Sequence, residues 1–325
     1  MKINFEVKYL GQTLKNPIII GSSGLTGNIE SIKLLEKNNA AAVVIKSIFE
    51  EQILIEKKEL SAQKIGNDFY NTFYNYSKNY SPTHYLKLIE QASKQTNIPI
   101  IASIIASASG NWIDFVKQIE QAGAKAIEIN FFRMPYDVAL NAIEYEKICI
   151  DILKAIKKET TLPIALKLGF WGLNISHLIK RIKIEKLAEA IVLFNKQYDL
   201  DIDIENNEFI AHNLLSSIDN TMPSLRWIAA LKQKTNIPLV ANTGVFSGYD
   251  IVKQILAGAT ATQVVSAIYK LGEGYITTML NQLRDWMIKK EYKKLDHFRG
   301  KMSFAKNMDI NRFEKQQFIK FYGSY

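Results

Sequence analysis

The chain has 325 residues, 47% of them hydrophobic and 22% charged, as is typical of a soluble globular protein with a large core. Its net charge of +9 comes from 41 basic residues scattered among 32 acidic ones, which disfavours a nucleic-acid partner and suits an anionic small molecule. The single cysteine, Cys149, excludes an internal disulfide and a thiolate metal cluster. Without a signal core or a membrane-spanning run, we expect a cytoplasmic protein with no membrane partner.

In chain order, residues 1–15 turn at Gly11 and are predicted to form a hairpin. Eight apolar runs follow it, with helical segments between them. Four of the runs begin after a proline and four after small residues. The prolines are Pro17, Pro99, Pro163 and Pro238, and the small residues are Ala40-Ala41, Ala122-Gly123-Ala124, Ala188 and Ala257-Gly258-Ala259.

These runs are almost continuously apolar, as a parallel sheet requires when helices cover both of its faces. Eight strands with seven intervening helical segments and one closing helix predict a (β/α)8 TIM barrel, formed by a single domain over residues 1–325. A doubly wound open sheet is the alternative, but it does not explain eight evenly placed units.

Three further segments exceed the needs of a barrel. The aromatic-rich residues 50–80 are predicted to lie over the C-terminal face as a lid, and residues 200–222 to carry a small hairpin around Asn206-Asn207. Residues 272–325 are predicted to be a C-terminal helical segment, in which Lys289 to Lys306 forms an amphipathic helix. Insertions between strand and helix fall on the catalytic face of such barrels, so the first two indicate function.

The stretch from Pro238 to Tyr269 indicates a phosphate site. One strand ends in Asn242-Thr243-Gly244 and the next in Ser266-Ala267, while Ser247 and Asp250 form a capping-box pattern between them. Gly244 is expected to let a ligand approach the main chain closely. The alternative is that these small residues only make tight turns.

Polar residues also follow the other predicted strands, at Ser22, Ser23, Lys46, Ser47, Ser103, Asn130, Lys167 and Asn195. Lys46 and Lys167 lie among apolar neighbours, where a cation needs an anion or an acceptor. We favour a ligand contact for both, with a salt bridge to Glu128 as the alternative. No carboxylate pair, metal-ligand spacing or serine-histidine set is evident, and the four histidines are isolated.

The order and spacing of these pieces resemble the FMN-dependent dihydroorotate dehydrogenases over nearly the whole chain. The residues that carry the resemblance are NPIIIGSSG, VVIKSIFEEQ, AIEIN, LPIALKL, IVLFN and ANTGVFSGYDIVKQILAGATATQVVSAIY. It implies a TIM barrel with FMN across its C-terminal mouth. By position, Thr243, Gly244 and Ser266, beside Asn242 and Ala267, would hold the phosphate, while Ser22, Ser23, Lys46 and Ser47 would line the flavin. Lys167 would face the pyrimidine edge of the ring and, with Asn130, take part in catalysis. Lys46, Asn130 and Asn195 would hold the substrate, and Asn195 would also contact the cofactor.

The chain departs from that family where the catalytic base belongs. The family supplies a cysteine or serine after the fourth strand, but residues 130–137 read NFFRMPYD and contain neither. Tyr136 and Asp137 are weak substitutes, since each is better suited to anchoring the loop, and Cys149 is expected to be a buried packing thiol. The loop after the second strand also lacks the expected asparagine and glycine pattern. A positioned base contributes about 10² to 10⁴ in rate, so weak dihydroorotate oxidation is expected.

Three functions follow, of which the first is an FMN-dependent oxidoreductase that acts on a CH–CH bond of a small planar substrate, dihydroorotate or a related compound of pyrimidine biosynthesis. The alternative is a pseudoenzyme or flavin-binding subunit that partners another oxidoreductase. A lyase or isomerase acting on a phosphorylated sugar shares the phosphate site but needs a catalytic carboxylate that we do not find. The resemblance also implies a homodimer.

Overall fold

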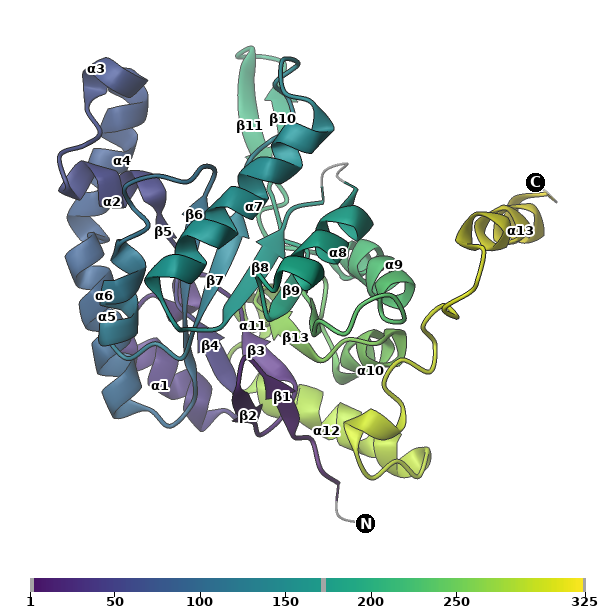
Figure 1. Ribbon diagram of the computed structural model, residues 1–325. Coiled ribbons are helices and arrows are strands. Elements are labelled where there is room, and N and C mark those ends of the chain that lie inside the picture. Colours follow the sequence, from purple (N-terminus) through teal and green to yellow (C-terminus); the bar gives the residue numbers. More distant parts are fainter. Residues whose placement is uncertain (1–2, 171–173, 324–325) are drawn as a thin grey trace.

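The computed structural model describes residues 3–170 and 174–323 (Figure 1). Its central sheet is a closed ring of parallel strands, because the first strand pairs with the last and every neighbouring pair in between is hydrogen-bonded. The ring comprises β3 (Ile18–Ile20), β4 (Ala42–Val44), β6 (Ile100–Ala106), β7 (Ala126–Phe131), β8 (Ile164–Leu168), β9 (Ala190–Leu193), β12 (Leu239–Ala241) and β13 (Ala261–Val264). The predicted (β/α)8 barrel is confirmed, and the open sheet is excluded because a closed ring has no edge strands.

One main helix follows each strand and covers the outside of the barrel (Figure 1). Buried strands explain why the apolar runs are continuous rather than alternating. The expected cap at Ser247 is present, since its side chain accepts from the Asp250 N–H. In α7, Asn141 with Glu144 forms a capping box that was not predicted. The helices are α1 (Ile29–Lys37), α5 (Pro82–Gln95), α6 (Phe115–Gln121), α7 (Ala142–Glu159), α8 (Ile175–Glu185), α9 (Thr221–Leu231), α10 (Gly248–Ala257) and α12 (Tyr275–Lys289).

The second strand is interrupted at the barrel mouth. After β4 the chain leaves the ladder at Lys46-Ser47 and rejoins it as β5 (Ile48–Phe49), which pairs with β6. Near this interruption, the Tyr85 hydroxyl on α5 makes two hydrogen bonds with the main chain of Ser103. It accepts from the N–H at 2.6 Å and donates to the carbonyl at 2.9 Å. Because of this interruption, two predicted site residues, Lys46 and Ser47, lie outside the strand ladder at the rim of the barrel.

The N-terminal residues form the expected hairpin, β1 (Val7–Tyr9) and β2 (Gln12–Leu14). It lies at the opposite end of the barrel from the mouth (Figure 1). Tyr9 and Leu14 are buried in the core, as the alternation of a hairpin with one covered face predicts. The hairpin therefore closes the bottom of the barrel and leaves the mouth for function.

Two insertions rise on the mouth side, at different edges (Figure 1). One comprises α2 (Glu50–Glu56), α3 (Ala62–Ile65) and α4 (Asn67–Asn79), and Phe73 of α4 packs edge-on against Phe49 at 5.3 Å between ring centroids. The other contains the expected hairpin, β10 (Asp199–Asp203) and β11 (Glu208–His212), followed by the short turn η2 (Ile218–Asn220). Both insertions are placed to border the mouth.

The C-terminal segment differs from its prediction. After α11 (Ser266–Leu271) and α12, residues 290–309 form turns with one short helix, η3 (Leu295–His297), and α13 (Ile310–Tyr322) comes only afterwards. The amphipathic helix predicted over Lys289 to Lys306 is therefore wrong. Tertiary contacts override the helical pattern there: Phe298 is buried against Trp286, and the Arg299 guanidinium donates to the carbonyls of Ala259 and Thr260.

Candidate active site

A pocket of about 230 Å³ opens at the C-terminal ends of the strands. It is bordered by tips of β3, β8, β9, β12 and β13, which lie far apart in the sequence and meet only because the barrel closes. Eight of the predicted site residues line it: Ser22, Ser23, Lys167, Asn195, Asn242, Thr243, Gly244 and Ser266. The structure thus gathers most of the predicted set in one place.

The turn after β12 is held in a left-handed conformation at two successive residues, Thr243 (φ 76°) and Gly244 (φ 75°). The side chains of Asn242 and Thr243 both donate to the carbonyl of Phe194, at 2.6 and 2.8 Å. A Cβ at Gly244 would lie 2.2 Å from the main-chain nitrogen of Thr221. A side chain at position 244 would therefore clash with the protein's own backbone. This is a reason for glycine other than the close ligand approach that we expected.

Ser216, from the loop before α9, joins the tips of β12 and β13. Its N–H and its hydroxyl both donate to the hydroxyl of Ser266 at 2.9 Å, and its hydroxyl accepts from the Gly244 N–H at 3.3 Å. It is 3% exposed. Sequence reasoning missed Ser216 because no pattern marks a loop serine, whereas the fold places it between the two turns predicted to hold a phosphate.

Lys167 forms a buried ion pair across the barrel interior with Glu128 on β7. Its Nζ lies 3.3 Å from Glu128 Oε1, and the two side chains are 5% and 1% exposed. The Gln263 side chain bridges them, since its Oε1 accepts from Lys167 at 2.9 Å and its Nε2 donates to Glu128 Oε2. Lys167 thus makes the salt bridge that we kept as the alternative, and it also lines the pocket.

The Glu128 carboxylate also affects the pKa of Tyr9, which belongs to the hairpin at the bottom of the barrel. Burial raises the pKa of Tyr9 well above its usual range, and the negative charge of Glu128 raises it further. The Tyr9 hydroxyl has no hydrogen-bond partner among the described residues. Tyr9 is therefore held neutral beneath the ion pair.

Three serines form a chain of hydroxyls from the pocket into the barrel wall. Ser22 Oγ lies 2.8 Å from Ser47 Oγ, which lies 2.8 Å from Ser103 Oγ. The Ser47 N–H also donates to Ser22 Oγ at 2.8 Å, so two hydrogen bonds with Ser47 hold the Ser22 hydroxyl in place. The chain ties the tip of β3 to the interrupted second strand.

Four predicted site residues do not line this pocket: Lys46, Ser47, Asn130 and Ala267. Lys46 instead lies over the rings of Tyr80, with Nζ 3.5 Å from the centroid, and Tyr76, at 5.3 Å. Asn130 is 6% exposed at the end of β7, and its Oδ1 has no hydrogen-bond partner in the part of the chain that the structure describes. Ala267 is fully buried at the start of α11.

The loop after β7 presents no base toward the pocket. Tyr136 is 80% exposed, and a carboxylate oxygen of Asp137 accepts from the Ala139 N–H at 3.0 Å, so Asp137 anchors the turn. Cys149 is buried in α7, where burial raises the pKa of its thiol. Within residues 3–170 and 174–323, no three His, Cys, Asp or Glu side chains are grouped to hold a metal.

Sequence reasoning also missed several lining residues besides Ser216. Gln263 lies inside the β13 run, and its side chain reaches Lys167 and Glu128. A polar residue within an apolar run was the available signal. Others come from loops whose place is decided by tertiary structure, and Tyr269 comes from α11. The loop residues are Lys196, Leu214, Leu215, Val245 and Val265.

A closed parallel barrel with polar strand tips around a pocket at its C-terminal mouth defines a TIM-barrel enzyme. The sequence profile of the family described as dihydroorotate dehydrogenase matches residues 4–287, and the chain belongs to this family of oxidoreductases that act on CH–CH donors. The recognised resemblance is thereby confirmed.

Curated relatives agree with this family. The chain is 27% identical over 301 residues to the dihydroorotate dehydrogenase B (NAD(+)) catalytic subunit of Thermoplasma volcanium, covering 89% of this chain and 95% of that protein. It is 24% identical over 282 residues to the dihydroorotate dehydrogenase A (fumarate) of Lactobacillus helveticus, covering 82% and 89%. Both types of the family are therefore similar to this chain over most of their length.

Proposed function

We propose that this protein is an FMN-dependent oxidoreductase that transfers hydrogen to or from a CH–CH bond of a small planar substrate, dihydroorotate or a close relative. The observation that carries the proposal is the polarity of the pocket. Hydroxyls and a main-chain N–H gather at the tips of β12 and β13, and the Lys167 cation lies in the wall on β8. A phosphate suits the first group, and an electron-rich ring suits the second.

The donor groups in place fit such a cofactor. Ser216 hydrogen-bonds both to Ser266 and to the Gly244 N–H, so the three groups gather in one small region that suits phosphate oxygens. Ser22 and Ser23 border the same pocket from β3. Asn130 keeps a buried amide oxygen free to accept from an N–H of a substrate ring. Lys46 joins the site only if it leaves the ring of Tyr80.

FMN, when bound, accepts or supplies the hydride, and the chain's own residues prepare its surroundings. Lys167 is held by Glu128 and Gln263, so its positive charge stays fixed beside the region where negative charge develops. The network of Ser22, Ser47 and Ser103 fixes one hydroxyl at the pocket wall. The described loop after β7 offers no base, so proton removal from dihydroorotate is expected to be slow.

The absorption spectrum of the purified protein tests this proposal. We expect a yellow protein, or a colourless one that takes up FMN with quenching of flavin fluorescence. Ser266→Ala should weaken FMN binding about tenfold, because one hydrogen bond to a charged group contributes about 1.5 kcal/mol or more. Ser107→Ala, a serine outside the pocket, is the control. A protein that binds no FMN at millimolar concentration contradicts the proposal.

A non-catalytic or flavin-binding subunit is the second candidate, and the loop without a base supports it. The relative from Thermoplasma volcanium is named a catalytic subunit, so that protein is one part of an assembly. This candidate predicts FMN binding without turnover of dihydroorotate under any acceptor, and recovery of a second oxidoreductase with the tagged protein. Steady turnover by the purified chain alone, including a homodimer of it, excludes this candidate.

A further inference from the structure

The positive charge of the protein is concentrated at its C-terminal end. Residues 288–325 carry ten lysines and arginines against four aspartates and glutamates, a net charge of +6 out of the chain's +9. They also lie outside the part of the chain that matches the family, residues 4–287. This segment therefore adds a strongly basic surface that the proposed chemistry does not need.

Helix α13 within this segment is amphipathic and solvent-exposed. None of the residues described in it is buried, and four apolar side chains near its end are 59% to 70% exposed: Phe318, Ile319, Phe321 and Tyr322. Arg312, Gln316 and Lys320 follow one another at intervals of four and so form a polar stripe that lies away from the helical positions of Phe318 and Phe321. A helix of this length has marginal stability in water without packing partners. Its exposed apolar side chains therefore indicate that another surface covers them.

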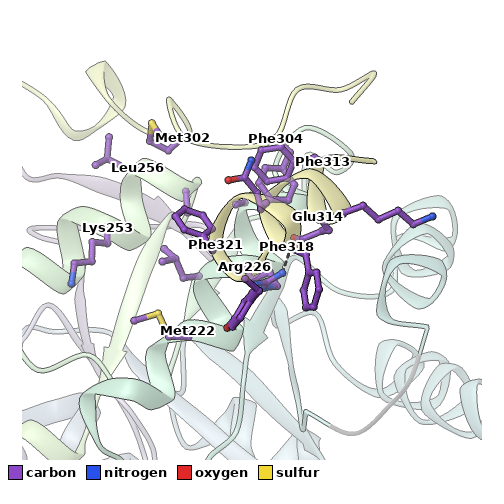
Figure 2. A pocket seen from close by; sticks show the side chains of 16 residues that line it. Met222, Arg226, Lys253, Leu256, Met302, Phe304, Phe313, Glu314, Phe318 and Phe321 are labelled. Carbon is purple, nitrogen blue, oxygen red and sulfur yellow. Dashed lines mark ion pairs between the residues drawn. The ribbon is translucent and has the colours of Figure 1, made fainter. Parts of the chain in front are cut away.

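The helix stands off from the barrel (Figure 1). An ion pair and a ring contact connect it to the rest of the described chain: Arg226 pairs with Glu314 at 2.6 Å, and the rings of Phe304 and Phe313 are 5.3 Å apart. Between α13 and the helices α9 and α10 lies a pocket of about 940 Å³ (Figure 2). Its size is within the range of ligand sites.

The lining of this pocket is mostly apolar. Met222 and Leu256 contribute from α9 and α10, Met302 and Phe304 from the turns before α13, and Phe318 and Phe321 from α13 (Figure 2). Lys253 and Lys315 are also part of the lining. An apolar interior with cations beside it suits a molecule that has a hydrocarbon part and an anionic group.

We propose that α13 and this pocket bind the surface of an anionic phospholipid bilayer. The exposed rings of Phe318 and Phe321 enter the boundary between headgroups and acyl chains, and an acyl chain fills the pocket. The cations of the C-terminal segment meet the lipid phosphates, and each basic residue near such a surface adds to the attraction. Among the described residues no helix is long and apolar enough to cross a membrane, and binding at the surface needs none.

Two other occupants fit the observations less well. A second copy of the chain on this face would bring two segments of net charge +6 together, which is unfavourable. A single-stranded nucleic acid needs cations and aromatic rings on one side, because phosphates and stacked bases are neighbours. In α13 the stripe of Arg312 and Lys320 is separate from the positions of Phe318 and Phe321, and among the cations of the described helix Lys315 alone neighbours Phe318 at a spacing of three. This pattern is closer to that of interfacial helices.

Co-sedimentation of the full-length protein with vesicles tests the proposal. We expect at least tenfold stronger binding to phosphatidylglycerol–phosphatidylcholine vesicles than to pure phosphatidylcholine, with weakening at 0.5 M salt. F318D/F321D should abolish binding, and K315E/K320E should reduce it at least tenfold. Phe209→Asp is the matched control, since this ring is 75% exposed on β11, away from α13, and should leave binding unchanged. Circular dichroism checks that each variant folds.

Equal binding to both vesicle types, or unchanged binding by F318D/F321D, overturns the proposal. Light scattering tests whether a second copy of the chain covers α13. A dimer that F318D/F321D converts to monomer would show that it does, and this result also overturns the proposal. Tighter binding of a single-stranded RNA than of the anionic vesicles also overturns it. These readouts need no cofactor, so they are independent of the proposed FMN function.

Discussion

Lys167 and Glu128 form an ion pair inside the barrel, with Nζ and Oε1 3.3 Å apart and both side chains almost fully buried. Gln263 hydrogen-bonds to both partners and so satisfies further donors and acceptors. A buried pair of this kind contributes little net stability over apolar residues, but removing one partner leaves an uncompensated charge. Its value for function is that a cation is fixed beside the pocket.

Breaking this pair should destabilise the fold. Lys167→Met is expected to lower the free energy of unfolding by about 3–5 kcal/mol, because the Glu128 carboxylate remains buried without its cation. Lys167→Met with Glu128→Gln should recover about 1–3 kcal/mol of the summed losses. Urea unfolding of the two single variants and the double variant measures this coupling, and strictly additive effects would show that the two residues do not interact.

Gly244 should not tolerate a side chain. Gly244→Ala forces a Cβ to 2.2 Å from the Thr221 nitrogen at a positive φ, and we expect a loss of at least about 2 kcal/mol. Gly11→Ala is the matched control, because its φ is +74° and its added Cβ meets nothing within 4 Å, so only about 1 kcal/mol is lost. Thermal unfolding compares the two, and equal losses would contradict the steric account.

Glu51 should make the fold less stable as the pH rises. Burial raises the pKa of its carboxyl from 4.5 to about 7, and the neighbouring Glu50 adds to the rise. Between those two pH values the folded state binds more protons than the unfolded state, so stability falls as the pH rises through this window. Glu51→Gln should flatten this slope in urea unfolding measured from pH 4.5 to 8.

Glu90 provides a control of opposite sign for this titration. Its hydrogen bond and charge interaction with Lys94 lower the pKa of its exposed carboxyl, so any contribution it makes is lost as the pH falls. Glu90→Gln should therefore leave the slope between pH 4.5 and 8 unchanged. A slope that persists in Glu51→Gln would assign the titration to another group.

Tyr80 is expected to compete with the cofactor for Lys46. The Lys46 Nζ lies 3.5 Å from the centroid of this ring, a contact that contributes about 0.5–1 kcal/mol. If Lys46 turns to the flavin, Tyr80→Leu should tighten FMN binding about two- to fivefold in a fluorescence titration. Tyr74→Leu, an exposed ring of α4 near Lys78, should have no effect. Unchanged affinity in Tyr80→Leu would place Lys46 outside the cofactor site.

Several parts of the site were predictable because strand ends of a parallel barrel must meet at one mouth. Ser22, Lys167, Asn195, Thr243 and Ser266 all line the pocket for this reason. Lys46 was not predictable, since the interruption between β4 and β5 leaves it over the rings of Tyr76 and Tyr80. A ladder break of this kind has no signal in an apolar run.

The C-terminal segment shows the same limit. Its helical spacing around Lys289 to Lys306 is real in the sequence, yet the buried Phe298 and the hydrogen bonds of Arg299 hold the chain in turns. Local propensity contributes tenths of a kilocalorie per residue, and tertiary contacts of a buried ring contribute more. Periodicity therefore decides only where packing does not compete.

By itself the sequence determined the barrel, because eight apolar runs punctuated by prolines and small residues permit little else, and it determined the family. Only the tertiary structure decided which polar groups meet. It paired Lys167 with Glu128, gave Gly244 its steric reason and brought Ser216 between the tips of β12 and β13. Hydrogen bonds and charges act over a few ångströms, and a linear order does not specify distances of that size.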